Sequence, residues 1–128
     1  MRLALRLICA CTLCVCAACG ETIEPKLSVI QEKIFTPTCA FSSCHDATTP
    51  ENDLDLTSGQ AFASLLEGTS PDTDVARVAP GDPENSLLYQ SLVGKAPADI
   101  RAMPLGGSLS DEEIEAIKEW INLGASNN

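Results

Sequence analysis

The sequence predicts an all-α fold of about four short helices joined by long loops. Apolar residues recur at the three- and four-residue steps of a helix face in several segments, and no alternating apolar run indicates a strand. Eight glycines and eight prolines separate many of these segments. A chain of 128 residues has room for one domain, which we place at residues 26–128.

Residues 1–18 have the order of a secretory signal. Arg2 and Arg6 precede an uncharged apolar run that ends in small residues. A membrane-spanning helix is the alternative, but the run covers only residues 7–20, whereas a bilayer crossing needs about 20 residues. We therefore expect residues 1–18 to be removed on export and residues 19–25 to act as an anchor linker.

Five of the seven cysteines lie within the first 19 residues. The segment around Cys19 resembles a bacterial lipoprotein signal, in which the cysteine at the cleavage site is acylated. Gly20 follows it, and for such signals the resemblance implies sorting to the outer membrane. We expect a periplasm-facing lipoprotein attached to the membrane through Cys19. Cys39 and Cys44 then remain as a pair in an oxidising compartment.

The acidic balance of the chain excludes one class of partner. The full sequence has a net charge of -10, and removing residues 1–18 takes away two basic and no acidic residues, which leaves -12. Surfaces that bind nucleic acid carry clustered Lys and Arg, and none occur here. We expect no nucleic-acid partner. The carboxylates near the carboxyl end are interpreted as a solvated helix face.

The first half of the domain contains two predicted helices. Helical spacing predicts the first at about 26–36, with Pro25 near its start and Pro37 ending it; its apolar face is Ile23, Leu27, Ile30 and Ile34. Residues 46–57 are polar and form a loop. A second helix is predicted at 58–66, with Gly68 just beyond it; its inward side chains are Ala61, Phe62, Leu65 and Leu66.

The second half begins with a long irregular loop, 68–84, of a kind that is usually functional. Asp82 as a cap and Pro83 at the first position predict a helix that continues to about Val93 and stops at Gly94.

The last predicted helix has the strongest signals. Ser110 and Glu113 form a capping box, Leu109 and Ile114 stand where a hydrophobic staple would lie, and Gly124 closes the end. Its apolar face is Ile114, Ile117, Trp120 and Ile121. Five aromatic residues make a thin core, so we expect a large apolar ligand at the centre; they are Phe35, Phe41, Phe62, Tyr89 and Trp120.

Cys39 and Cys44 are separated by four residues, and His45 follows directly. Covalent haem attachment needs a cysteine beside a histidine, because the thiol adds to a haem vinyl group while the imidazole bonds the iron. The usual spacing has two intervening residues. Four require a bulged loop, which Ser42 and Ser43 are suited to form.

Other interpretations of these three residues do not involve haem. A Cys39–Cys44 disulfide, with His45 at the surface, explains the pair in an exported protein. A closed zinc site takes four ligands, and only three stand here besides carboxylates. Hydrolytic catalysis has no recognisable nucleophile at motif spacing.

Met103 is the other candidate ligand. Residues 19–128 contain a single His and a single Met, and His with Met is a common ligand pair in electron-carrying haem proteins. Met103 lies in a turn with Pro104, Gly106 and Gly107, which suits the presentation of a side chain. Filling a gap in the core is the alternative role for a lone methionine.

These motifs resemble the small monohaem c-type cytochromes, particularly the planctomycete-type cytochrome c modules of bacterial exported proteins and lipoproteins. The resemblance covers about residues 27–125. It departs from that family in the lengthened Cys spacing and in Ala102, which stands between Arg101 and Met103. The matching segments are Cys39, Cys44 and His45, then residues 78–83 leading to 86–89, 103–107, 109–113 and 120–125.

The resemblance implies a cytochrome c-like fold wrapped on one covalent haem c, with the first and last helices crossing at its edge. Cys39 and Cys44 would be the thioether links, His45 the proximal ligand and Met103 the distal ligand. We expect an electron carrier, and not an enzyme in itself, that meets a redox partner with a basic docking face. The alternative is a haem-free envelope lipoprotein with a disulfide and a binding or structural role.

Overall fold

The computed structural model describes residues 22–128, so the predicted signal peptide and the anchor at Cys19 lie outside the described residues. Within this range the regular structure is helical, and extended backbone pairs only in one antiparallel bridge between Thr69 and Ala76. The all-α class is therefore confirmed. In the same range, no helix combines the length and the apolar character that a bilayer crossing requires.

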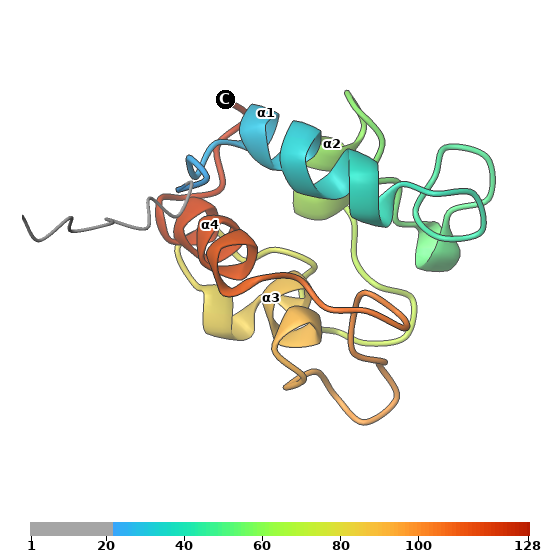
Figure 1. The fold of residues 1–128 in the computed structure, drawn as a ribbon. Helices are drawn as coiled ribbons and strands as arrows, with labels where there is room; N and C mark the ends of the chain where they lie inside the picture. The colour runs from blue at the N-terminus through green and yellow to red at the C-terminus, as the bar shows by residue number, and fades with distance from the viewer. Residues whose placement is uncertain (1–21) are drawn as a thin grey trace, which may run out of the picture.

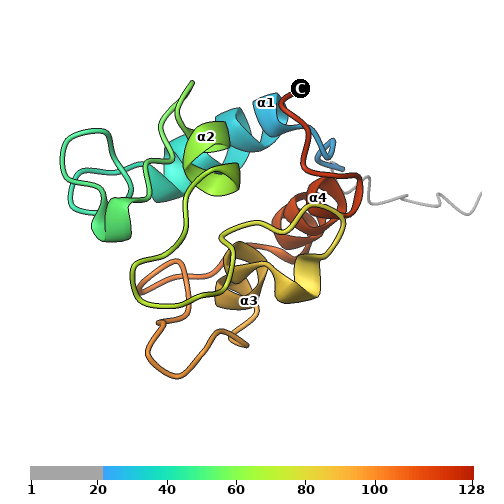
Figure 2. The ribbon, with the colours of Figure 1, turned by 180° about the vertical axis from the view of Figure 1, so that it is seen from behind.

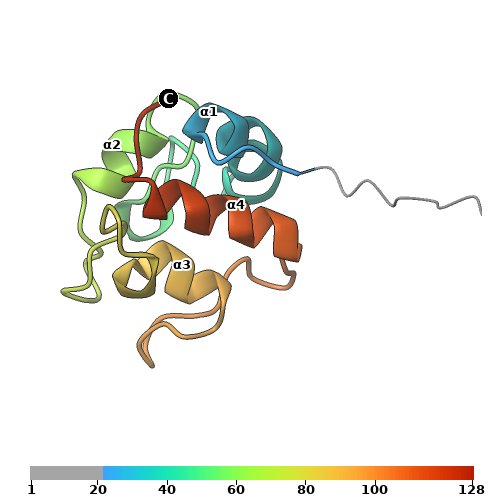
Figure 3. The same cartoon turned by 90° about the vertical axis from the view of Figure 1, so that its left-hand side faces the viewer.

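The helices are short and are connected by long loops. Helix α4 lies between α3 on one side and the pair α1 and α2 on the other, and it packs against both α1 and α3 (Figures 1, 2 and 3). In chain order the elements are α1 (Leu27–Ile30), η1 (Gln31–Cys39), η2 (Glu51–Asp53), α2 (Ala61–Leu66), η3 (Pro83–Asn85), α3 (Leu87–Leu92) and α4 (Asp111–Asn122).

The first helix is longer than predicted because Pro37 does not end it. After Ile30 the helix widens into π-helical turns, which make up η1 and run through Pro37 to Cys39. Proline has no N–H to donate, so it disrupts an ordinary α-helical turn. The wider turn closes beyond it, where the Ala40 N–H donates to the Phe35 carbonyl at 2.8 Å. The helix thereby delivers Cys39 at its last position.

Two predicted helices are shorter or broken in the structure. The helix expected from residue 58 begins at Ala61, and the helix expected over 83–93 is split into η3 and α3 by extended backbone at Ser86. Ser86 is fully buried, and its hydroxyl donates to the Asp82 carbonyl at 2.9 Å while accepting from the Ala79 N–H at 2.8 Å. These bonds satisfy loop backbone groups that a continuous helix would leave unpaired.

Helix α4 has the predicted ends. The Ser110 side chain accepts from the Glu113 N–H, and the Glu113 carboxylate accepts from the Ser110 N–H, which completes the capping box. At the other end Gly124 adopts a left-handed φ of 97°, its N–H donates to Ile121, and the Ala125 N–H donates to Trp120. This pair of bonds is a Schellman motif.

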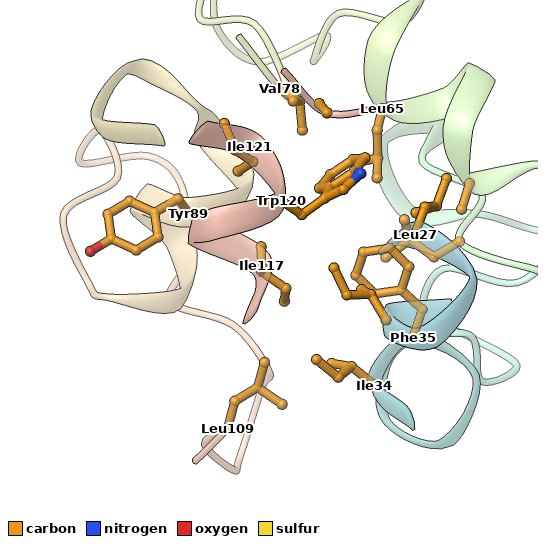
Figure 4. Close-up of a cluster of buried hydrophobic side chains, with 14 residues drawn as sticks. Leu27, Ile34, Phe35, Leu65, Val78, Tyr89, Leu109, Ile117, Trp120 and Ile121 are labelled. Carbon is orange, nitrogen blue, oxygen red and sulfur yellow. The ribbon is translucent and has the colours of Figure 1, made fainter. Parts of the chain in front are cut away.

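The core joins the two ends of the domain. Trp120 of α4 points toward Leu65 and toward the side of the core formed by Leu27 and Phe35 (Figure 4). Asn128 accepts from the Leu27 N–H at 2.9 Å and so caps the first helix. The prediction for the aromatic residues was wrong at Phe41, which is 53% exposed, and Phe62 is only half-buried. Aliphatic side chains make up most of the buried cluster instead.

Candidate functional site

The segment from Cys39 to His45 folds into a bulged loop. The Cys44 N–H donates to the Phe41 carbonyl at 3.0 Å, and Ser43 takes a left-handed φ of 69°. The His45 N–H then returns to the Cys39 carbonyl at 3.2 Å. The four residues between the cysteines thus form the bulge. A backbone hydrogen bond holds Cys39 and His45 together across it.

The His45 ring is oriented by a backbone carbonyl. Nδ1 lies 3.1 Å from the Leu54 carbonyl oxygen. A carbonyl only accepts, so Nδ1 carries the proton, and Nε2 of the neutral ring keeps its lone pair. The His45 carbonyl also accepts from the N–H of the buried Leu56 at 2.9 Å. Residues 54–56 therefore form hydrogen bonds with both the ring and the backbone of His45.

Burial lowers the pKa of His45 below its ordinary value of 6.5. The loss of hydration is the largest cause and disfavours the imidazolium, while backbone bonds to Leu54 and Glu51 act in the opposite direction. At neutral pH the ring is therefore neutral. A neutral imidazole whose other nitrogen is bound to a carbonyl is the form that ligates a transition metal.

Cys39 and Cys44 are free thiols in different surroundings: Cys39 is half-buried and Cys44 is exposed. The pKa of Cys39 is raised from 9.0 to about 11, first by burial and then by the charges of Cys44 and Glu113. Burial is therefore the main reason that the Cys39 thiol keeps its proton.

Met103 lies on a different segment, between α3 and α4. It is half-buried, and its N–H donates to the Ser91 carbonyl at 3.0 Å, which fixes the turn to α3. Among residues 22–128 no backbone hydrogen bond joins this turn to the His45 loop. The ligand role of Met103 remains a prediction.

Arg77 is a residue of this region that the sequence analysis did not identify. It is only 5% exposed, and its guanidinium donates to the Asn52 carbonyl at 2.6 Å and to the Ser64 carbonyl at 2.9 Å. Its sequence neighbours Ala76 and Val78 are apolar. Sequence alone does not show burial of an arginine, because a long side chain usually carries its charge to water.

Two surface hollows lie elsewhere. The larger, of about 520 Å³, is lined by Thr22, Ile23, Pro25 and Ala116 together with Asp111, Glu112, Glu115 and Glu119. The smaller is formed by residues 69–74. Over residues 22–128 no group of three or more His, Cys, Asp or Glu side chains is placed to hold a metal ion, so the zinc interpretation gains no support there.

Neither a family model, nor a curated protein, nor a solved structure matches this chain.

Proposed function

We propose that this chain is an exported monohaem c-type cytochrome domain that carries single electrons in the periplasm or at the outer membrane. The observation that best supports the proposal is the setting of His45. Its ring is neutral, its Nδ1 donates to Leu54, and two free thiols flank the loop that ends at it. This is the donor set that covalent haem attachment requires.

Each proposed ligand has a distinct task. Cys39 and Cys44 would provide the thiols for two thioether links, and His45 Nε2 and the Met103 thioether would hold the iron. A haem c bound in this way supplies an iron that accepts and releases one electron. The Leu54 carbonyl orients the His45 ring and makes its free nitrogen a stronger donor.

Exposed apolar side chains also support the proposal. Phe41 lies in the loop between the cysteines and is 53% exposed, and Leu105 lies two residues after Met103 and is 58% exposed. In the proposed haem-loaded protein, both side chains would be available to contact the porphyrin.

The proposal is tested by the intact mass and the visible spectrum of the protein from a strain competent in cytochrome c maturation. The mass should exceed that of the processed chain by one haem that survives acid-acetone extraction. The double variant Cys39→Ala/Cys44→Ala is the matched control and should lose the covalent haem. A colourless parent protein would overturn the proposal.

A haem-free lipoprotein with a disulfide is the second candidate. The observation in its favour is that the His45 N–H donates to the Cys39 carbonyl at 3.2 Å, which brings the backbone beside Cys44 back to Cys39. The same mass measurement separates the candidates, because a disulfide makes the chain lighter by two hydrogen atoms. A colourless chain with that mass would establish the second candidate.

The proposed localisation depends on Cys19, through which the chain would be attached to the outer membrane. One acyl chain holds a protein only marginally, whereas lipoprotein processing supplies more than one. Cys19→Ser should therefore release the protein into the soluble periplasmic fraction, with Cys44→Ser as the matched control that stays with the membrane. Membrane association of the Cys19 variant at the level of the parent would contradict the anchor.

A further inference from the structure

Arg77 holds a central position in the fold. Its carbonyl accepts from the Leu88 N–H at 3.0 Å, which places its backbone at the start of α3. Its side chain is buried and bonds to Ser64 of α2 and to Asn52 of the loop 46–57. Burial of a charge is costly unless polar groups compensate it, so this position needs an explanation.

The two hydrogen bonds of Arg77 fix the segment that carries Leu54. One goes to Asn52, which together with Asp53 has a left-handed φ of about 55°. The other goes to Ser64, whose hydroxyl in turn accepts from the Asp55 N–H at 3.2 Å. The backbone is thus tied on both sides of Leu54. Left-handed backbone is strained for non-glycine residues and persists where surrounding contacts hold it.

Gly68 shows that the end of α2 is shaped around the same guanidinium. A Cβ at Gly68 would collide with Nη1 of Arg77 and with the Ser64 carbonyl oxygen. The absence of a side chain there lets the guanidinium reach that carbonyl. The three residues therefore act together. They hold the backbone segment that carries the Leu54 carbonyl.

We propose that Arg77 is a positioning residue for His45 and that its buried charge raises the reduction potential of an iron bound there. The Arg77 guanidinium binds the Asn52 carbonyl and so holds the backbone that leads to Leu54. The Leu54 carbonyl in turn binds Nδ1 of the His45 ring. The second part rests on the proposed function. The first part concerns the chain itself and holds with or without haem.

The proposed effect on the reduction potential depends on the buried position of the Arg77 charge. Over residues 22–128 no ion pair joins Arg77 to a carboxylate, and its two hydrogen bonds go to neutral carbonyls. The Asp53 carboxylate offsets part of the charge without forming an ion pair. The hydrogen bond to the Asn52 carbonyl places this charge two residues from Leu54, whose carbonyl holds the His45 ring. A weakly screened positive charge disfavours the more positive, oxidised state of a nearby iron.

The test compares Arg77→Gln and Arg77→Lys with the control Lys95→Gln, which removes one positive charge from an exposed side chain. Nitrogen-15 NMR of the full processed chain without haem, at a pH where His45 is neutral, measures the share of the Nδ1–H tautomer. Voltammetry of the haem-loaded protein measures the midpoint potential, and circular dichroism confirms folding.

Arg77→Gln should lower both the Nδ1–H share and the midpoint potential. Arg77→Lys should lower the share, because an ammonium lacks the planar fork that spans two carbonyls, but it should restore most of the potential by keeping the charge. Lys95→Gln should leave the share unchanged and move the potential less than Arg77→Gln does.

An unchanged Nδ1–H share in both Arg77 variants would overturn the positioning role. A drop in potential in Lys95→Gln as large as that in Arg77→Gln would overturn the electrostatic role, since net charge rather than place would then be responsible. If Arg77→Gln does not fold, the tautomer share in Arg77→Lys decides the positioning role. A colourless parent overturns the proposed function, and the tautomer measurement still decides the positioning of His45.

Discussion

A single carbonyl oxygen determines which nitrogen of His45 is available. Because Leu54 accepts from Nδ1, the lone pair of the neutral ring resides on Nε2, and the ring cannot rotate without losing the bond. An unpaired Nδ1 would allow both tautomers and several ring orientations. In the proposed ligand role of His45, the Leu54 backbone carbonyl would therefore matter as much as the ring itself.

Met103 is expected to tune the iron. In the haem-loaded protein, Met103→Ala should abolish the weak long-wavelength absorption of the thioether–iron bond and lower the midpoint potential, because a methionine ligand raises it. The matched control is Leu105→Ala, which alters the same turn at an exposed side chain. If the Met103 variant keeps the spectrum and potential of the parent, the sixth position belongs to another group.

The raised pKa of Cys39 predicts a loss of stability in alkali. In the haem-free chain the folded protein keeps this thiol proton up to about pH 11, while the unfolded chain releases it near 9.0. The unfolded chain binds fewer protons between these values, so the free energy of unfolding falls as the pH rises, by up to about 3 kcal/mol.

Denaturant titrations at pH 8 to 11 measure that fall, and Cys39→Ala provides the comparison, since it removes the titrating thiol and leaves the other alkaline groups in place. The fall should be smaller in the variant. Parallel stability curves for parent and variant would show that burial does not hold the proton of Cys39.

Local backbone was predictable where it depends on sequence neighbours. The spacing of Cys39, Cys44 and His45 predicts a bulged loop, which the structure shows, whereas their role in binding haem stays a prediction. Arg77 was not identified, because its partners Asn52 and Ser64 are 25 and 13 residues away in the chain. The Leu54 bond was missed for the same reason: a backbone carbonyl leaves no trace in the sequence.

Among the elements, α4 is the one whose local signals agree with its packing. Its capping box gives a clear expectation: Ser110→Ala should lower the free energy of unfolding by about 1 kcal/mol, because the Glu113 N–H loses its acceptor. Ser108→Ala changes an exposed serine outside the box and should have little effect. Urea titration of both variants is the measurement, and equal stabilities would contradict the role of the box.

The other elements differ from their predictions where tertiary contacts override local signals. Pro37 is a normal stop signal, but the π-helical turns of η1 carry the chain past it and still bury Ile34 and Phe35. Ser86 breaks the expected 83–93 helix because its buried hydroxyl serves the preceding loop. Neither outcome follows from periodicity, since both depend on which carbonyls lie nearby after folding.

At the scale of the whole molecule, charge is expected to guide encounters with a partner. Glu115 and Glu119 line the hollow beside α4, together with other carboxylates of that helix. Complementary charge raises association rates, and salt screens it over about 8 Å at physiological ionic strength. Electron transfer with a basic partner should therefore slow as salt rises.

Glu115→Gln/Glu119→Gln should lower that bimolecular rate at low salt and leave the midpoint potential nearly unchanged, because the substitutions lie outside the ligand-bearing segments. Stopped-flow kinetics over a range of ionic strength measures the rate. A parent rate that does not change with salt would show that the acidic surface has no part in docking.

The buried position of Trp120 makes the chain its own optical reporter. It is the only tryptophan in the sequence, it is 1% exposed, and its indole N–H donates to the Ser126 carbonyl. Its emission should therefore be blue-shifted in the folded protein and move to the red on unfolding. A haem bound at His45 would accept its excitation energy and quench it, so one fluorescence trace would follow both cofactor loading and the integrity of the core.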